Sequence, residues 1–375
     1  MLAEPVESAW ADVDPIPMNS SVEAALRWLL NSGIQQPNGG VSRYYRADSR
    51  AYRDVSTELT GYFLGAVIRP GRGGALPEQA LRAGRFLIEQ GFDRQSELFP
   101  FEIPGPGDSK PRLAYFFDCG IIIRGLVKLW ESTNESAFLD AAERCGLALA
   151  GRMRRVDGAF FPLLNLDTGE PFEGADQWSL RSGVYHLKVG LAFRELSVIT
   201  GLAEFDSCLG DLKRWCLACH EAFLPGHDDP ERVMDRMHAY GYFLEGLLPY
   251  AGLEADSSRA LQFGVLKLEN LVAEIGPSFL RCDVVAQLLR LRLFAEKLGV
   301  MELDYRQAEE EAAVVRGFQQ EPADPAIQGG FAFARRSGQT VPHINPASTI
   351  FALQALDMWD QTKDGCLTTT WRELV

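Results

Sequence analysis

Two acidic residues stand at corresponding places in the sequence, each at the start of an apolar run. Glu58 precedes the uncharged run 59–68, and Asp118 precedes a run that includes 121–130. If these runs are helices, both carboxyl groups lie in a first turn, where negative charge is favoured. Two carboxyl groups at one cleft can act as general acid and general base on a glycosidic bond. Helix capping is the alternative, and it suits Asp118 better, because a Ser-Thr pair before Glu58 could cap that helix.

A third segment has charged and aromatic residues before its own apolar run. Asp176 could replace either carboxyl group as acid or base, and Arg181 could hold a substrate carboxylate by a bidentate contact. Tyr185 and His186 follow closely, and we count them among the residues that contact substrate. Surface ion pairing is the alternative role for the two charged residues.

A fourth segment offers a different chemistry. His238 and Tyr240 together could abstract a proton beside the carboxylate of a uronate sugar, as a lyase or an epimerase requires. Arg181, Arg281 or His343 could neutralise that carboxylate. The alternative for His238 is a hydrogen-bonded histidine near the start of a helix.

Aromatic and polar residues are frequent in the long segments between these runs. Aromatic faces beside polar groups are typical of sugar-binding sites, although such residues could instead pack the loops onto the helices. The substrate-binding candidates of this kind are Tyr44, Tyr45, Trp178 and Phe331. Asp283, close to Arg281, is a further candidate at the start of a fifth run.

The elements that position these residues follow from an internal repeat. Glycines recur about every sixty residues, at Gly61, Gly120, Gly183 and Gly241, and the rhythm continues near Asp283 and Ala347. The six runs are apolar on nearly all faces, which is typical of buried helices. Six amphipathic segments alternate with them. Their approximate limits are 21–31, 77–90, 137–153, 204–222, 257–275 and 302–318.

Twelve alternating helices predict an all-α fold, an (α/α)6 toroid of six helical hairpins with the apolar helices in the inner ring. An open α-solenoid, which also repeats helix pairs, is the alternative. We expect a single domain over 1–375 with its core at about 20–360, and short strands near 159–161 and 330–334. The long connections follow the outer helices, so they should gather over the N-terminal ends of the inner helices and form the cleft there. They are 32–56, 91–117, 157–182, 223–237 and 319–346.

Composition narrows the classes of partner. The net charge of −14 argues against binding to nucleic acid or to an anionic membrane, and no run approaches the ~20 apolar residues of a membrane span. The first residues lack the features of a signal peptide, and the seven cysteines are scattered, so we expect reduced thiols and a cytoplasmic protein. Cys216, Cys219 and His220 match a haem-attachment spacing, but that chemistry requires export. The same residue types could bind zinc, but no second pair of ligands at metal spacing is present. We therefore expect no cofactor and no metal.

Short phrases in the sequence resemble the six-hairpin, (α/α)6-toroid superfamily of carbohydrate-active proteins, over about 20–360. They are Thr57-Glu58-Leu59-Thr60-Gly61-Tyr62, Phe117-Asp118-Cys119-Gly120, Arg124-Gly125-Leu126 and Gln328-Gly329-Gly330-Phe331. The resemblance implies a glycoside hydrolase, a uronate lyase or a sugar epimerase. In layout it is closest to unsaturated-uronyl hydrolases, which use acidic residues at the starts of inner helices, although their full acidic signature is not present.

The sequence therefore predicts an enzyme that acts on an oligo- or polysaccharide, and we favour hydrolysis by Glu58 and Asp118. A uronate lyase or epimerase that uses His238 and Tyr240 is the first alternative. A toroid without catalytic activity, which binds a glycan or a partner protein in polysaccharide biosynthesis, is the second.

Overall fold

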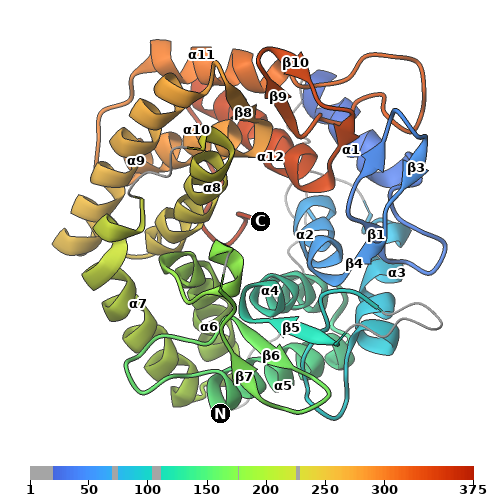
Figure 1. The fold of residues 1–375 in the computed structure, drawn as a ribbon, viewed down its shortest axis with the longest axis vertical. Helices are drawn as coiled ribbons and strands as arrows, with labels where there is room; N and C mark the ends of the chain where they lie inside the picture. The colour runs from blue at the N-terminus through green and yellow to red at the C-terminus, as the bar shows by residue number, and fades with distance from the viewer. Residues whose placement is uncertain (1–19, 70–74, 104–110, 176, 225–228) are drawn as a thin grey trace.

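A computed structural model describes residues 20–69, 75–103, 111–175, 177–224 and 229–375. Within these ranges, twelve α-helices form two concentric rings (Figure 1). The inner helices are α2 (Thr57–Val67), α4 (Phe116–Thr133), α6 (Leu187–Thr200), α8 (Pro230–Leu247), α10 (Cys282–Lys297) and α12 (Pro346–Lys363). The outer helices are α1 (Ser20–Asn31), α3 (Glu78–Phe86), α5 (Ser136–Arg152), α7 (Ala203–Phe223), α9 (Ala255–Ile275) and α11 (Tyr305–Arg316).

The inner ring is closed. Each inner helix packs against the next one in the chain, and α12 packs against both α10 and α2. This closure confirms the (α/α)6 toroid and excludes the open solenoid. No described helix is both long enough and apolar enough to pass through a lipid bilayer.

Glycines of the inner helices allow these helices to approach closely. A Cβ atom added to Gly125 of α4 would lie 2.6 Å from the carbonyl oxygen of Gly61 in α2, and one added to Gly61 would lie 2.9 Å from Cα of Ile122. Real Cβ atoms do not approach backbone atoms so closely. The glycines therefore lower helix propensity but allow α2 and α4 to pack backbone against backbone.

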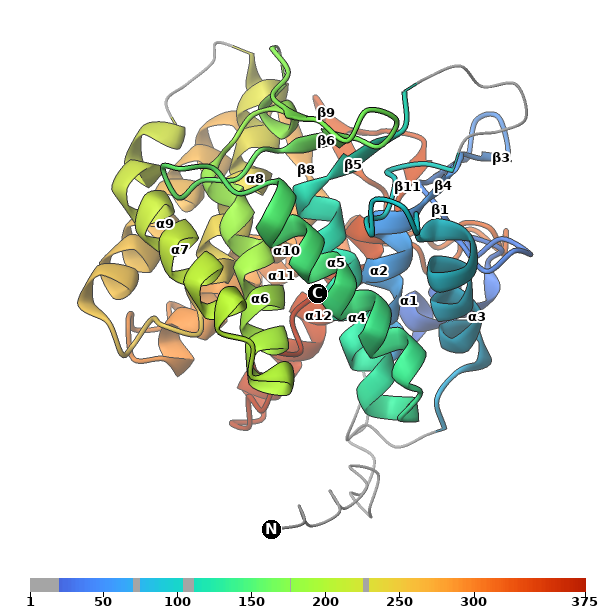
Figure 2. The same ribbon diagram turned by 90° about the horizontal axis from the view of Figure 1, so that it is seen from below.

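Short antiparallel strands join the connections above the N-terminal ends of the inner helices (Figure 2). In one sheet, β1 (Val41–Ser42) pairs with β4 (Val55–Ser56), and in a second, β2 (Tyr45–Arg46) lies between β3 (Ala51–Tyr52) and β11 (His343–Ile344). In a third, β6 (Leu163–Asn165) lies between β5 (Leu113–Tyr115) and β7 (Pro171–Phe172). In the fourth, β9 (Ala334–Arg336) lies between β8 (Phe279–Arg281) and β10 (Gln339–Thr340).

Three local expectations differ from the structure. The segment 223–237 was expected to be a long connection, but α8 begins at Pro230, because proline suits a first helical turn and the Asp229 carboxylate accepts a hydrogen bond from the Glu231 N–H at 2.9 Å. Residues 159–161 make only an isolated bridge through Phe160, and the strand follows at β6. Residues 331 and 332 likewise make single bridges, and β9 begins at Ala334.

Candidate functional site

The carboxyl groups of Glu58 and Asp118 are not helix caps. The Ser56 hydroxyl caps α2 by accepting a hydrogen bond from the Leu59 N–H at 3.2 Å, so Glu58 is not the cap of this helix. Asp118 lies in the first turn of α4 and is only 5% exposed. Its Oδ2 atom is buried and has no hydrogen-bond partner among the described residues. A buried carboxyl oxygen without a partner is costly for stability, so a role in binding or catalysis explains it better than capping does.

The two carboxyl groups affect each other's protonation. Burial raises the pKa of Glu58 from 4.5 to about 7, and the charge of Arg43 opposes this only in part. Burial raises the pKa of Asp118 well above its ordinary value, and the nearby charge of Glu58 raises it further. The two groups therefore titrate as a pair, in which the ionisation of one opposes the ionisation of the other.

A chain of hydrogen bonds crosses the ring interior beside this pair. His238 Nδ1 lies 2.6 Å from the side-chain oxygen of Gln287, and His238 Nε2 lies 2.9 Å from the hydroxyl of Tyr242. The Tyr62 hydroxyl donates to the Tyr242 hydroxyl at 3.0 Å. Glu58 is close enough to both tyrosines for its charge to contribute to their raised pKa values, after the larger effect of burial.

His238 is neutral, and its tautomer follows from its partners. Burial lowers the pKa of His238 to about 4. Because an amide oxygen can only accept a hydrogen bond, Nδ1 carries the proton and donates it to Gln287. Nε2 is then free to accept from Tyr242. The chain thus runs in one direction, from Tyr62 through Tyr242 to His238.

Arg281 is already paired with two carboxylates. Its Nε and Nη2 atoms contact Asp283 at 2.9 and 2.7 Å, and its Nη1 atom contacts Asp235 at 2.6 Å. Asp283 Oδ2 also lies 3.9 Å from His238 Nε2. Arg281 and Asp283 therefore border the histidine as a bidentate ion pair, and little of the arginine's charge is left to hold a substrate carboxylate.

Tyr240 does not join His238. Its hydroxyl lies 2.9 Å from Nδ1 of His220 on the outer helix α7. Residues four apart share one face of a helix, so Tyr242, and not Tyr240, lies beside His238. The placement follows from the early start of α8, because both tyrosines then lie well inside a continuous helix.

The predicted aromatic contacts divide into two groups. Tyr44 and His343 are partly exposed and stack on each other with ring centroids 4.8 Å apart, and Trp178 is also partly exposed. Tyr45 and Phe331, by contrast, are 4% and 0% exposed and belong to the hydrophobic core. In the first group, part of each side chain remains exposed to solvent.

Of the remaining candidates of the third segment, Tyr185 is close enough to the carboxyl pair for the charge of Asp118 to raise its pKa, after the larger effect of burial. His186 is fully buried between Phe116 and Tyr185, and burial lowers its pKa to about 3. The Tyr185 hydroxyl donates to the carbonyl oxygen of Arg181 at 3.0 Å, and the Arg181 side chain is exposed. Asp176 lies outside the described residues.

Three residues of this site were missing from the sequence-based candidates: Tyr62, Tyr242 and Gln287. The sequence Gly-Tyr-Phe-Leu occurs at 61–64 and again at 241–244, and the first two residues are its tyrosines. This repeat could have identified them. The sequence around Gln287 carries no comparable signal. Among the described ranges, no three His, Cys, Asp or Glu side chains are arranged as metal ligands.

The sequence matches no protein-family model and no curated protein. The fold, however, is shared with solved structures of low sequence identity. A cellobiose 2-epimerase from Bacillus thermoamylovorans is 15% identical, with a TM-score of 0.66 over 90% of this chain and 99% of the other. A sugar epimerase from a ruminal bacterium is 10% identical, with a TM-score of 0.65 over 88% and 97%. An α-amylase from Clostridium perfringens is 10% identical, with a TM-score of 0.62 over 91% and 99%. These likenesses show the toroid fold.

Proposed function

We propose that this protein is a carbohydrate-active enzyme that hydrolyses a glycosidic bond with Asp118 and Glu58 as its acid and base. The observation that carries the proposal is the unpartnered, buried Oδ2 of Asp118 in electrostatic contact with a second carboxyl group of raised pKa. Glycoside hydrolysis requires such a pair, in which one carboxyl group is protonated while the other is ionised.

Burial and charge assign the two roles. Asp118 has the more strongly buried carboxyl group, and the charge of Glu58 opposes its ionisation as well, so we assign the shared proton to Asp118. It would donate this proton to the glycosidic oxygen as the bond to the anomeric carbon breaks. Glu58, once ionised, would either remove a proton from the attacking water or attack the anomeric carbon itself. The anomeric configuration of the first product distinguishes these two routes.

The surrounding residues suit a sugar ring. The chain from Tyr62 to His238 contains phenol oxygens, and each of these has an acceptor lone pair that a sugar hydroxyl could use. Tyr44, stacked on His343, provides a partly exposed aromatic face at the rim. Two of the structurally similar proteins described above are sugar epimerases and one is an α-amylase, which supports a carbohydrate as the class of substrate, although one fold can host several chemistries.

A second candidate function is epimerisation of a sugar or elimination from a uronate. It is favoured by His238, which is neutral and has an Nε2 lone pair 2.9 Å from the Tyr242 hydroxyl. In this reaction His238 would abstract the proton and Tyr242 would return or donate one. Because Arg281 already pairs with Asp283 and Asp235, it is less able to bind the carboxylate of a uronate.

Three assays on one substrate panel separate these functions. The panel contains neutral and uronate-containing oligosaccharides. New reducing ends report hydrolysis, ultraviolet absorbance reports the unsaturated product of a lyase, and deuterium uptake from heavy water reports an epimerase.

Two substitutions test the assigned roles. Glu58→Gln and Asp118→Asn should each abolish new reducing ends, whereas Glu310→Gln, at an exposed position of α11, should not. Hydrolysis that persists at full rate in both site variants would refute the carboxyl pair. Deuterium uptake or absorbance that requires His238 but neither carboxyl group would instead establish the second candidate. If no panel member reacts in any assay, both enzymatic candidates are contradicted for these glycans.

A further inference from the structure

A cavity of about 740 Å³ lies at the other end of the ring, away from the strands. Its walls come from α2, α4, α6 and the segment 370–375. Apolar side chains form much of the wall, among them Ile121, Val127, Trp130, Ile199 and Leu374. This volume is in the range of small-molecule sites, which combine an apolar wall with a few polar groups.

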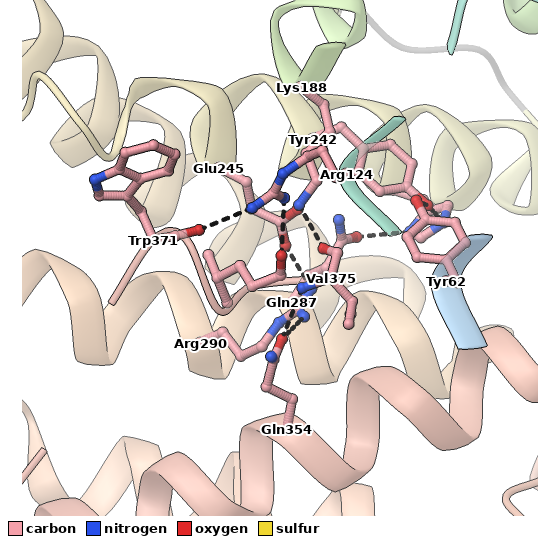
Figure 3. A network of polar contacts seen from close by, with 12 residues as sticks. Tyr62, Arg124, Lys188, Tyr242, Glu245, Gln287, Arg290, Gln354, Trp371 and Val375 are labelled. Carbon is pink, nitrogen blue, oxygen red and sulfur yellow. Dashed lines mark hydrogen bonds and ion pairs between the residues drawn. The ribbon is translucent and has the colours of Figure 1, made fainter. Parts of the chain in front are cut away.

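The segment 370–375 is a fixed wall of this cavity. Arg124 donates to the main-chain oxygens of Trp371, Arg372 and Leu374 at 3.2, 3.1 and 2.8 Å, and contacts Glu195 at 3.0 Å. Figure 3 shows Arg124 and Lys188 converging on this part of the chain. The guanidinium of Arg124 is therefore fully engaged and is not a binding group for a ligand.

Lys128 is the exception among the cations of this cavity. Its ammonium group donates to the carbonyl oxygen of Gly65 at 2.7 Å, and no carboxylate of the described chain lies within ion-pair distance of it. An ammonium group has three donors, so two remain for a ligand. Burial, and then the charge of Arg124, lower its pKa to about 8, so it is mostly protonated at neutral pH.

The charged neighbours of Lys128 all have other partners. Arg124 pairs with Glu195, and Arg69 pairs with Asp357. Glu373 accepts a hydrogen bond from the Thr370 N–H, and its carboxylate keeps the charge that favours the protonated form of Lys128. Arg372 pairs with Glu131, and both are exposed. Lys128 thus brings to a largely apolar cavity a positive charge that no carboxylate of the described chain contacts directly, although Glu373 and Glu195 favour its charged form from a distance. An anion in direct contact would stabilise this charge further.

We infer that this cavity is a second ligand site, which binds a small organic anion with its apolar body against Trp130 and Ile199 and its acidic group on Lys128. Tyr62 also lines this cavity while its hydroxyl donates to Tyr242 on the other side. A ligand here would therefore touch one residue of the chain that leads to His238. This inference does not depend on which reaction the carboxyl pair performs.

Two fluorescent probes with nearly the same apolar body test the site. 8-Anilino-1-naphthalenesulfonate carries an anionic group, and N-phenyl-1-naphthylamine does not. We expect the full chain at pH 7 to bind the anionic probe about tenfold more tightly, because an ion pair with Lys128 adds to the apolar contact. Equal affinities, or stronger binding of the neutral probe, would overturn the inference.

Variants locate the bound probe. Lys128→Met should remove the preference for the anion and keep binding of the neutral probe, whereas Lys128→Arg should retain the preference. Lys267→Met, an exposed position of α9, is the matched control. Ile199→Trp should weaken both probes by filling the cavity. A preference that survives Lys128→Met places the anion elsewhere, for example in the groove near Arg214 and Arg259, and overturns the inference.

A pH titration of the unaltered protein keeps the test decisive if the methionine variant does not fold. The preference for the anion should fall between pH 7 and 9.5, because Lys128 loses its proton with a pKa at or somewhat above 8 when the anion is bound. Surface lysines remain charged over most of this range. A preference that is constant to pH 9.5 would contradict a role for Lys128.

Discussion

The side-chain oxygen of Gln287 in α10 lies 2.6 Å from Nδ1 of His238 in α8, so one inner helix sets the tautomer of a histidine on its neighbour. Gly241 makes this contact sterically feasible, since a Cβ atom there would lie 2.9 Å from Cδ of Gln287. The repeated glycine in α8 therefore admits a polar side chain, whereas Gly61 of α2 admits the backbone of α4 at Ile122. The same repeat position thus serves packing in one part of the ring and the site in another.

Replacing Gln287 by glutamate should raise the pKa of His238 from about 4 toward the ordinary range of histidine, because a carboxylate at Nδ1 stabilises the imidazolium. Gln287→Met, which offers no charge, should leave the pKa low. Ring carbon chemical shifts of the five histidines, followed against pH by NMR, provide the measurement, and His238→Asn identifies the signal. An unchanged titration in the glutamate variant would show that Gln287 does not contact the imidazole.

Glu58 should make the fold less stable as pH rises. Its folded pKa of about 7 exceeds its ordinary 4.5, so the folded state binds the proton more tightly than the unfolded state does. Its contribution to stability is full below about pH 4.5 and is lost as pH rises to about 7. Because Glu58 is partly exposed, we expect a loss of about 1–2 kcal/mol, less than the full pKa difference implies.

Urea unfolding of the parent and of Glu58→Gln at pH 5 and pH 8 measures this contribution. Between pH 5 and pH 8, the parent should lose about 1–2 kcal/mol more free energy of unfolding than the amide variant does. Identical differences would show that Glu58 is not desolvated in the folded protein.

If the proposed hydrolysis is correct, kcat/KM should have a bell-shaped pH dependence. The rate should fall below about pH 7, where Glu58 becomes protonated, and it should also fall once Asp118 loses the proton that burial and the charge of Glu58 favour. The two limits belong to the pair and not to single residues. A profile that is flat between pH 5 and 9 would contradict catalysis by these groups.

The ring could be predicted because its signals are periodic, whereas the site depends on where one helix begins. Glycines about sixty residues apart, in apolar runs, indicate buried helices that must meet closely. The start of α8 at Pro230 was missed, because residues 230–237 are polar enough to resemble a loop. That early start places Tyr242 beside His238 and directs Tyr240 to α7.

Contacts between distant helices leave no signal in a single sequence. Gln287 is an ordinary polar residue in a helical pattern, and only the crossing of α8 and α10 brings its amide to an imidazole. The cavity at Lys128 likewise requires the segment 370–375 to fold back onto α4.

Glu245 should be essential for folding. Its carboxylate is fully buried and pairs with Lys188 at 2.7 Å and with Arg290, so Glu245→Gln leaves two buried cations without a counter-ion (Figure 3). We expect a loss of about 3–5 kcal/mol in the free energy of unfolding. Glu269→Gln is the matched control, because Arg292 keeps its second partner Glu311 and Glu269 is 33% exposed. Equal losses in the two variants, measured by urea unfolding, would contradict the central role of Glu245.

Alanine at two helical glycines should have opposite effects on stability. Alanine has the higher helix propensity, so Gly210→Ala in α7, where an added Cβ meets nothing within 4 Å, should raise the free energy of unfolding by about 0.5–1 kcal/mol. Gly125→Ala makes the same change in α4, but its Cβ would lie 2.6 Å from the Gly61 carbonyl oxygen. The two helices must then separate, and overpacking of this kind costs about 1–3 kcal/mol, which exceeds the gain in propensity. Urea unfolding of both variants compares the two terms directly. If Gly125→Ala is as stable as Gly210→Ala, α2 and α4 do not meet backbone to backbone, and close packing no longer explains the glycines of these two helices.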